Sequence, residues 1–315
     1  MASAATVLSA PAPASGMPGA RRPGTPRRHW DQRGWIFVAP FLLVFALAFI
    51  APIVYSIQLS LFREQLFFGG TAFVGLDNYA VVFGDAKFWE AFGRVLRFLA
   101  VQVPIMLLLA LLAALAIDSA RLHAAGMFRI VIFLPYAVPG VVATLMWGFM
   151  YGDLFGLAAD LNKLFGTEVI QPLSDSWMLT SIANIVTWEY IGYNMLIFYS
   201  ALRVVPHERY EAAAIDGAGQ FRIIHSIKLP ALRGALVIAT IFSIIGSFQL
   251  FNEPNLLRPL APNVITSHYT PNVYAYNLSF EGQQYNYSAT VAIVMGVLTA
   301  VIAYLVQLRG ARREA

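Results

Sequence analysis

The chain has 315 residues, of which 58% are hydrophobic and only 12% are charged. Because about a quarter of the residues in an ordinary soluble protein are charged, this composition excludes a water-soluble globular protein. Cysteine is absent, which excludes disulfides, catalytic thiolates, iron–sulfur clusters and cysteine-bound zinc. The five histidines lack the spacing of a metal site, so no metal ligands are expected.

The first 33 residues are rich in alanine, proline, glycine, serine and arginine. Such a segment buries too little apolar surface to fold, so residues 1–33 are predicted to be a disordered cytoplasmic tail. A cleavable signal peptide is the alternative interpretation. However, the apolar run after residue 33 is longer than the usual core of about 7 to 15 residues, and no small-residue cleavage site follows closely. We therefore expect an uncleaved first span, and residues 34–315 to form a transmembrane domain.

Six stretches are long enough to cross a bilayer, which takes about 20 apolar residues as a helix. Five of them contain no Asp, Glu, Lys or Arg, and the remaining one contains only Glu189. The apolar runs are continuous rather than alternating, which favours helices over β-strands. The predicted fold class is therefore an all-α membrane protein with six transmembrane helices. The spans are predicted at about 35–61, 97–117, 129–151, 177–202, 232–252 and 286–308, and the third should bend at Pro135, Pro139 and Gly140.

The distribution of basic residues predicts the orientation. With six spans both chain ends share one side of the membrane, and most of the lysines and arginines fall on that side. The positive-inside rule then places both termini in the cytoplasm, with the chain as a multi-pass protein of a bacterial plasma membrane. Because the basic residues are spread over several loops and do not gather on one soluble face, nucleic-acid binding is not expected.

A loop at residues 203–231, between the fourth and fifth spans, is predicted to contain a short cytoplasmic helix. Pro206 suits the first turn of a helix, Glu208 and Glu211 suit its positive end, and the alanines that follow favour helix. Gly217 and Gly219 should end it. Small side chains on such a helix let another protein approach closely, although an ordinary solvated loop helix would have the same composition.

The spacing in this loop resembles the EAA loop of binding-protein-dependent ABC importer permeases. Glu211-Ala212-Ala213 is followed after three residues by Gly217, and after nine more by Ile227-Lys228-Leu229-Pro230. Residues 73–79, Leu134-Pro135 with Trp147, and residues 251–254 resemble the carbohydrate branch of that family. The chain is similar to the maltose-type and glycerol-3-phosphate-type permeases, specifically to the first of the two permease subunits, over nearly all of its length from about residue 30.

This resemblance implies a type I ABC importer permease fold, with the pathway in the permease and ATP binding in a separate subunit. The EAA segment would form a coupling helix that sits in a groove of a separate ATP-binding subunit. Glu211 would be its charged contact, Ala212 and Ala213 would permit close approach, and Gly217 would make the turn. The residues that would fix the return into the fifth span are Ile227, Leu229 and Pro230.

The resemblance also implies the partners. These would be a second, homologous permease that completes a heterodimer, two ATP-binding subunits and an extracytoplasmic solute-binding protein. ATP and Mg²⁺ would be bound by the ATPase subunits, and this chain would hold no cofactor and no catalytic residue. The sequence agrees, because it contains no G-x-x-x-x-G-K-[ST] motif.

Polar residues inside a bilayer are costly, so each one is a candidate for lining a pathway. On the fourth span Asn184, Tyr190 and Asn194 fall on one side, with Tyr193 at its edge, whereas Glu189 lies about 100° around the helix from Tyr190. Glu189 could border the cavity, pair with a neighbouring helix, or couple transport to protons. The predicted substrate-pathway residues are Trp147, Asn184, Glu189, Tyr190, Tyr193, Asn194, Gln249, Asn252 and Glu253.

Sugars need hydrogen-bonding groups for their hydroxyls and flat apolar surfaces for their C–H faces, and this set supplies both. Helix-to-helix hydrogen bonds and interfacial aromatics would explain the same residues without a substrate. The expected function is a permease subunit for a sugar or polyol. The alternatives are a proton-coupled secondary carrier that uses Glu189 and a membrane-embedded, lipid-linked sugar transferase, although the loop acids are too dispersed to favour the latter. Apart from Arg97, Arg129 and Arg233 at their ends, the spans carry no basic residue, which favours a neutral cargo.

Overall fold

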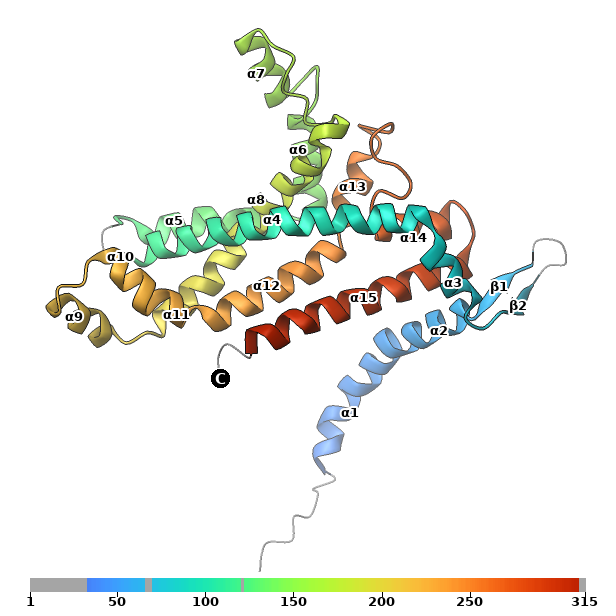
Figure 1. Ribbon diagram of the computed structural model, residues 1–315, viewed down its shortest axis with the longest axis horizontal. Coiled ribbons are helices and arrows are strands. Elements are labelled where there is room, and N and C mark those ends of the chain that lie inside the picture. Colours follow the sequence, from blue (N-terminus) through green and yellow to red (C-terminus); the bar gives the residue numbers. More distant parts are fainter. Residues whose placement is uncertain (1–32, 66–69, 120–121, 312–315) are drawn as a thin grey trace, which may run out of the picture. The chain divides into compact units, whose positions relative to one another are not determined.

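The computed structural model describes residues 33–65, 70–119 and 122–311 (Figure 1). The predicted tail at 1–33 thus lies outside the described residues except for its last position. The chain divides into two units, Met1–Ile50 and Ala51–Ala315. In the first unit, α1 (Arg33–Phe45) continues into a π-helical segment, η1 (Ala46–Ile50). Phe41, Phe45 and Phe49 stack along it, with ring centroids 5.9 and 5.4 Å apart.

The second unit begins with a short helix and a hairpin. These are α2 (Ala51–Ser60) and the antiparallel pair β1 (Phe62–Glu64) and β2 (Thr71–Phe73), in which Phe62 pairs with Phe73. A short helix, α3 (Asp77–Gly84), leads into the 33-residue α4 (Ala86–Asp118).

Helix α4 begins well before the span predicted at 97–117. Asp85 caps it by accepting a hydrogen bond from the Lys87 amide at 2.9 Å. Phe88, Phe92 and Val95 are buried at helical spacing, so the extra turns pack against the protein and do not fray.

The third predicted span is a broken helix. It consists of α5 (Ala125–Phe133), a 3₁₀ turn η2 (Leu134–Ala137) and α6 (Gly140–Met150), and the two α-helices meet at 94°. The predicted bend is confirmed, because Pro135 and Pro139 lack the amide donor that a continuous helix needs. The chain then forms α7 (Leu157–Phe165) and the 29-residue α8 (Asp175–Arg203).

The rest of the chain is helical apart from its connections. Its elements are α9 (His207–Ile215), α10 (Gln220–Ile223), the π-helical η3 (Ile224–Lys228), α11 (Leu229–Ala231), α12 (Arg233–Phe248), α13 (Asn252–Leu257), α14 (Pro271–Phe280) and α15 (Tyr285–Ala311).

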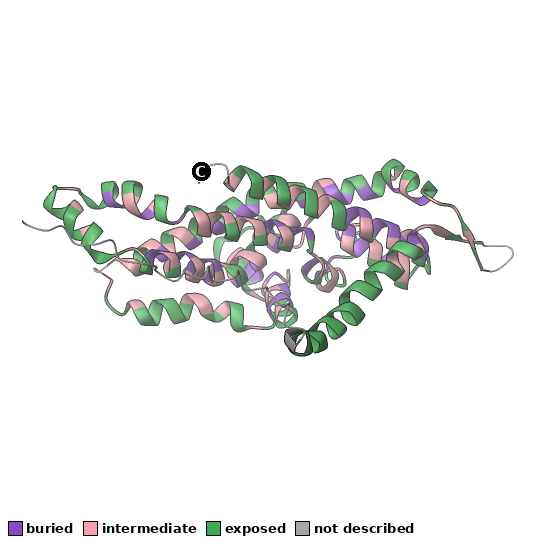
Figure 2. Cartoon of the chain, turned by 90° about the horizontal axis from the view of Figure 1, so that it is seen from below, coloured by how far each residue is buried: buried purple, intermediate pink, exposed green. Residues whose placement is uncertain are grey.

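The core of the second unit lies where α4, α8 and α12 pack together, side by side in Figure 1. Ala110 and Ala114 of α4 are fully buried against Phe198 and Leu202 of α8, and Ala239 of α12 joins them. Small residues let membrane helices approach closely and gain van der Waals contact. Buried positions gather on these facing surfaces, whereas outward-facing positions are exposed (Figure 2).

Among the described residues, four helices are long and apolar enough to cross a membrane, and the bent α5–α6 pair would be a fifth. The four are Trp35–Ser60, Ala86–Asp118, Arg233–Leu257 and Tyr285–Gly310. The predicted fourth span corresponds to α8, which is long enough but carries more polar and aromatic side chains. The chain is therefore a multi-pass helical membrane protein, and the count of six spans stays a prediction.

Candidate functional site

A cavity of about 400 Å³ lies among α4, η2, α8, α12 and α13. It brings together residues that are far apart in the sequence, because α8 supplies one wall and the end of α12 with the start of α13 supplies another. The predicted pathway residues that line it are Tyr190, Tyr193, Asn194, Gln249, Asn252 and Glu253. We refer to this space as the inner cavity.

One wall of the inner cavity is aromatic. Tyr136 of η2 stacks on Tyr193, with ring centroids 5.0 Å apart and an interplanar angle of 22°, and it meets Tyr190 edge-on at 5.8 Å. The sequence-based prediction missed Tyr136, since it lies in the proline-rich break and not on a regular helix face. Three tyrosines of this kind combine flat apolar surface with hydroxyl groups.

The tight crossing of α8 with α5 holds this aromatic wall in place. A Cβ atom on Gly192 would lie 2.2 Å from the Ile132 carbonyl oxygen and 2.6 Å from the Phe133 Cα atom. Only glycine can occupy this position without forcing the two backbones apart. The residue after this contact, Tyr193, therefore faces the turn that carries Tyr136.

The rest of the cavity lining is polar and amide-rich. Gln102 of α4 donates to Thr187 Oγ1 at 3.3 Å, and Asn194 donates to the Tyr190 carbonyl at 3.0 Å. Gln102 was also missed, because a lone amide in the second span has no accompanying polar stripe. Glu253 is buried, and the lining residues include no Lys, Arg or His. The cavity can thus bind hydroxyl groups but offers no cation for an anion.

Three predicted pathway residues lie outside the inner cavity. Asn184 donates to the Tyr151 hydroxyl at 2.8 Å and so ties α8 to the end of α6. Trp147 packs edge-on against Trp188, with ring centroids 5.8 Å apart.

Glu189 is the third of these residues. Its Oε1 would lie 3.2 Å from a Cβ on Gly140, so its carboxyl group faces the first residue of α6. Its Oε2 is buried without a hydrogen-bond partner in the described part of the protein, so the three roles considered for Glu189 stay predictions.

Residues 203–231 contain the predicted short helix, which is α9. Glu211 and Ala212 are exposed on α9, and the helix contains no buried residue. Gly217 has φ +77°. Its amide donates to the Ala214 carbonyl at 3.0 Å, and the Ala218 amide donates to the Ala213 carbonyl at 2.9 Å. This pair of bonds is the Schellman motif, which explains the glycine at this position.

The return to the membrane passes through η3, α11 and α12. Ile227 and Leu229 are half-buried, and Pro230 is exposed within the first turn of α11. Two large apolar side chains near the motif, Ile215 and Phe221, are 87% and 83% exposed. An exposed helix of small residues beside exposed apolar side chains is typical of a surface that another protein covers.

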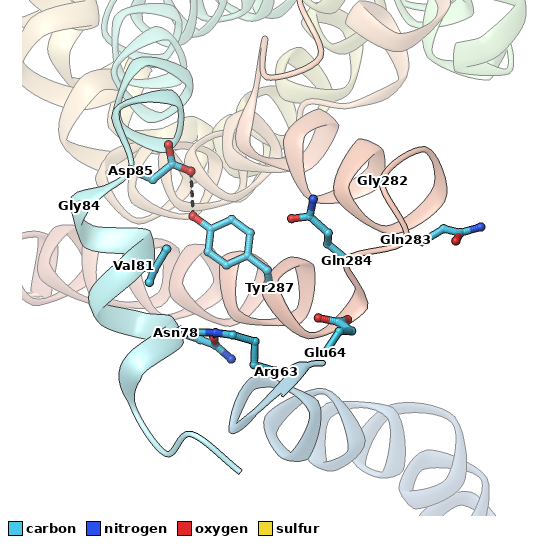
Figure 3. A pocket seen from close by; sticks show the side chains of 10 residues that line it. All are labelled: Arg63, Glu64, Asn78, Val81, Gly84, Asp85, Gly282, Gln283, Gln284 and Tyr287. Carbon is cyan, nitrogen blue, oxygen red and sulfur yellow. Dashed lines mark hydrogen bonds between the residues drawn. The ribbon is translucent and has the colours of Figure 1, made fainter. Parts of the chain in front are cut away.

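A second, larger cavity of about 860 Å³ lies at the ends of α3, α4 and α15 (Figure 3). We refer to it as the outer cavity, and no predicted pathway residue lines it. Asp85 accepts hydrogen bonds from the hydroxyls of Tyr274 and Tyr287 at 2.6 and 2.8 Å. Burial alone would raise the pKa of Asp85, but these bonds and those from the Lys87 and Phe88 amides lower it below its usual value.

Comparison with known proteins identifies the family. Residues 106–313 match the family described as "Binding-protein-dependent transport system inner membrane component". The lactose transport system permease protein LacF of Rhizobium radiobacter is 31% identical over 286 residues, which cover 89% of this chain and 94% of that protein. The trehalose/maltose transport system permease protein MalF of Thermococcus litoralis is 29% identical over 278 residues, with 86% and 92% covered.

The fold matches as well. A chain in the crystal structure of a bacterial ABC transporter involved in the import of the acidic polysaccharide alginate has a TM-score of 0.78 at 18% identity, covering 91% of this chain and 99% of that one. Members of the matched family are not enzymes, and ATP hydrolysis takes place in a separate subunit. The chain belongs to the family of binding-protein-dependent transport system inner membrane components and is a permease subunit of an ABC importer.

Proposed function

We propose that this chain forms half of the membrane pathway for a neutral sugar or polyol, with the inner cavity as its contact surface for the cargo. The observation that carries the proposal is the pairing of the Tyr136, Tyr190 and Tyr193 wall with an amide-rich wall. Such a pair of walls fits the C–H faces and the hydroxyls of a sugar together. The relatives named for lactose and for trehalose and maltose support the same class of cargo.

The charge of the inner cavity supports a neutral cargo. Phosphate and carboxylate ligands are ordinarily held by Arg or Lys, and the only ionisable acid among the lining residues is Glu253. A carboxylate accepts hydrogen bonds from hydroxyls but repels an anion. A phosphate-bearing sugar would therefore be disfavoured at this site.

The remaining parts of the importer follow the same proposal. A second homologous permease would complete the pathway as a heterodimer, and a solute-binding protein would deliver the cargo from outside. Two ATP-binding subunits would bind ATP and Mg²⁺ and would contact α9 through Glu211, Ala212 and Ala213. Gly217 would shape the turn, and Ile227, Leu229 and Pro230 would guide the chain back to α12. Six spans with both termini in the cytoplasm would place α9 on the ATPase side.

Tyr136 provides the test of the pathway. In proteoliposomes that contain the full importer, replacement Tyr136→Ala should lower ATP-dependent uptake of the neutral sugar about tenfold, because it removes the central ring of the aromatic wall. Tyr136→Phe should retain most of the uptake, since it keeps the stacking. The matched control is Tyr304→Ala, at a position that is 60% exposed on α15 and outside the cavity.

Two results would contradict the proposal. One is wild-type uptake by the Tyr136→Ala variant at sugar concentrations below saturation. The other is uptake that a proton gradient sustains without ATP, which would restore the carrier mechanism based on Glu189.

A further inference from the structure

A buried ion pair joins the ends of two helical segments that are far apart in the sequence. Lys228 Nζ lies 2.6 Å from Asp118 Oδ2, and their side chains are only 10% and 12% exposed. Asp118 is the last residue of α4, and Lys228 is the last residue of the π-helical η3. Lys228 occupies the unspecified position of the I-x-L-P segment, so the motif itself gives no reason to expect a charged contact there.

Neither charge is favourably placed without the other. The C-terminal end of a helix carries a partial negative charge, and Asp118 adds a carboxylate to that end of a 33-residue helix. A buried ammonium group without a partner is equally costly. The two groups compensate each other at short range, which distinguishes this pair from the exposed pairs that contribute little.

Tyr210 of α9 is the third member of this cluster. The centre of its ring lies 5.5 Å from Lys228 Nζ, within the range of a cation–π contact. Burial, and then the charge of Asp118, raise the pKa of Tyr210, so its hydroxyl stays neutral. Tyr210 directly precedes Glu211, and α9 contains no buried residue. The cluster therefore gives an exposed helix a contact with the membrane helices.

Helix α4 continues from this cluster to the inner cavity. Met106, Gln102 and Phe98 of α4 line that cavity, and Met106 lies about 18 Å along the helix axis from Asp118. Over this distance α4 is packed against α8 through fully buried Ala110 and Ala114. A packed, continuous helix moves as one piece, so displacement of its end reaches the cavity wall.

We propose that Asp118, Lys228 and Tyr210 form the joint that transmits movement of α9 into α4 and so to the inner cavity. The inference rests on the proposed coupling role of α9 and adds specific positioning residues to it. Lys228 connects the two helices, since it contacts the carboxylate of one and the ring of the other. The π-helical turn that ends at Lys228 supports this role, because such turns are frequent at functional sites.

The test measures coupling rather than uptake alone. The full importer is reconstituted with Asp118→Asn, Lys228→Met or Lys228→Arg, and sugar imported per ATP hydrolysed is recorded. Asp118→Asn and Lys228→Met should each lower this ratio about tenfold, the usual size of a coupling between sites. Lys228→Arg keeps a cation between the Asp118 carboxylate and the Tyr210 ring, so it should retain most of the ratio. The matched control is Lys163→Met, because Lys163 is exposed on α7.

A purely structural pair would give a different result. Uptake and ATP hydrolysis would then fall in parallel with the amount of assembled importer and leave the ratio unchanged. That outcome, or a Lys228→Arg variant as defective as Lys228→Met, overturns the inference. Failure of the proposed function is distinguishable, because a variant with both Glu211→Ala and Gly217→Val would then transport like the wild type.

A variant at Tyr210 keeps the test decisive if the variants of the ion pair assemble poorly. Tyr210→Leu leaves Asp118 and Lys228 in place and removes only the ring that links Lys228 to α9. It should lower the sugar imported per ATP hydrolysed several-fold, whereas Tyr210→Phe, which keeps the ring, should not. A wild-type ratio in Tyr210→Leu would contradict the joint.

Discussion

The inner and outer cavities differ in what their tyrosine hydroxyls do. At the outer cavity, which is the larger, the hydroxyls of Tyr274 and Tyr287 donate to Asp85 at 2.6 and 2.8 Å. In the inner cavity, the hydroxyls of the three tyrosines of the aromatic wall make no hydrogen bond to the described part of the protein. Hydroxyls without a protein partner can bind the hydroxyls of a sugar, so we propose the smaller cavity, and not the larger one, as the cargo site.

The largest effect of a single substitution is expected at Gly192, where α8 crosses α5 most closely. Gly192→Ala would place a Cβ 2.2 Å from the Ile132 carbonyl, so α8 must move away from α5 and the Tyr136–Tyr193 stack must open. The free energy of unfolding should fall by about 3 kcal/mol, and uptake should be nearly abolished. Thermal unfolding in detergent and uptake by the reconstituted importer measure the two effects. The control is Gly296→Ala on α15, where a Cβ would have no neighbouring atom within 4 Å, and it should change neither stability nor uptake. If Gly192→Ala also changes neither, the close crossing of α8 and α5 does not hold the aromatic wall in place.

Replacement of Asp85 should lower the stability of the protein without changing its affinity for the cargo. Asp85→Asn weakens the bonds to Tyr274 and Tyr287 and should lower the free energy of unfolding by about 1 kcal/mol, with the KM for the sugar unchanged. Because the folded protein lowers the pKa of Asp85, its carboxylate stabilises the protein above about pH 4, and this contribution is lost as the pH falls below that value. Unfolding temperatures between pH 3 and pH 7 should show this loss in the wild type and less of it in the variant. A raised KM would instead make the outer cavity a cargo site.

The smallest effect is expected at Gln283, which also lines the outer cavity. Its φ of +53° is unfavourable for a residue with a side chain, so Gln283→Gly should raise the free energy of unfolding by about 0.5 kcal/mol. Uptake should stay at the wild-type rate. If the Gln283 amide contacts cargo or the solute-binding protein, uptake will fall although the protein becomes more stable.

The parts of this molecule set by local chemistry could be predicted from the sequence. The α9 helix ends where Gly217 adopts a positive φ, and the third span breaks where Pro135 and Pro139 remove amide donors. In both cases the deciding residues lie within a few positions of the feature.

The parts set by contacts between distant segments could not be predicted. The placement of Tyr136 depends on how closely Gly192 approaches α5, and Lys228 and Asp118 are 110 positions apart. The approach of Gly140 to Glu189 involves the 94° angle at the break, and proline content alone does not fix that angle.

The break between α5 and α6 also bears on how the chain exists in a membrane. From Leu134 to Pro139 the backbone lacks the continuous helical hydrogen bonds that allow a polypeptide to face hydrocarbon, and Leu134 and Tyr136 are exposed there. This seam requires protein or water beside it, not acyl chains. An isolated chain would expose this seam to lipid, so we expect it to be less stable in a bilayer than the same chain paired with the second permease proposed above.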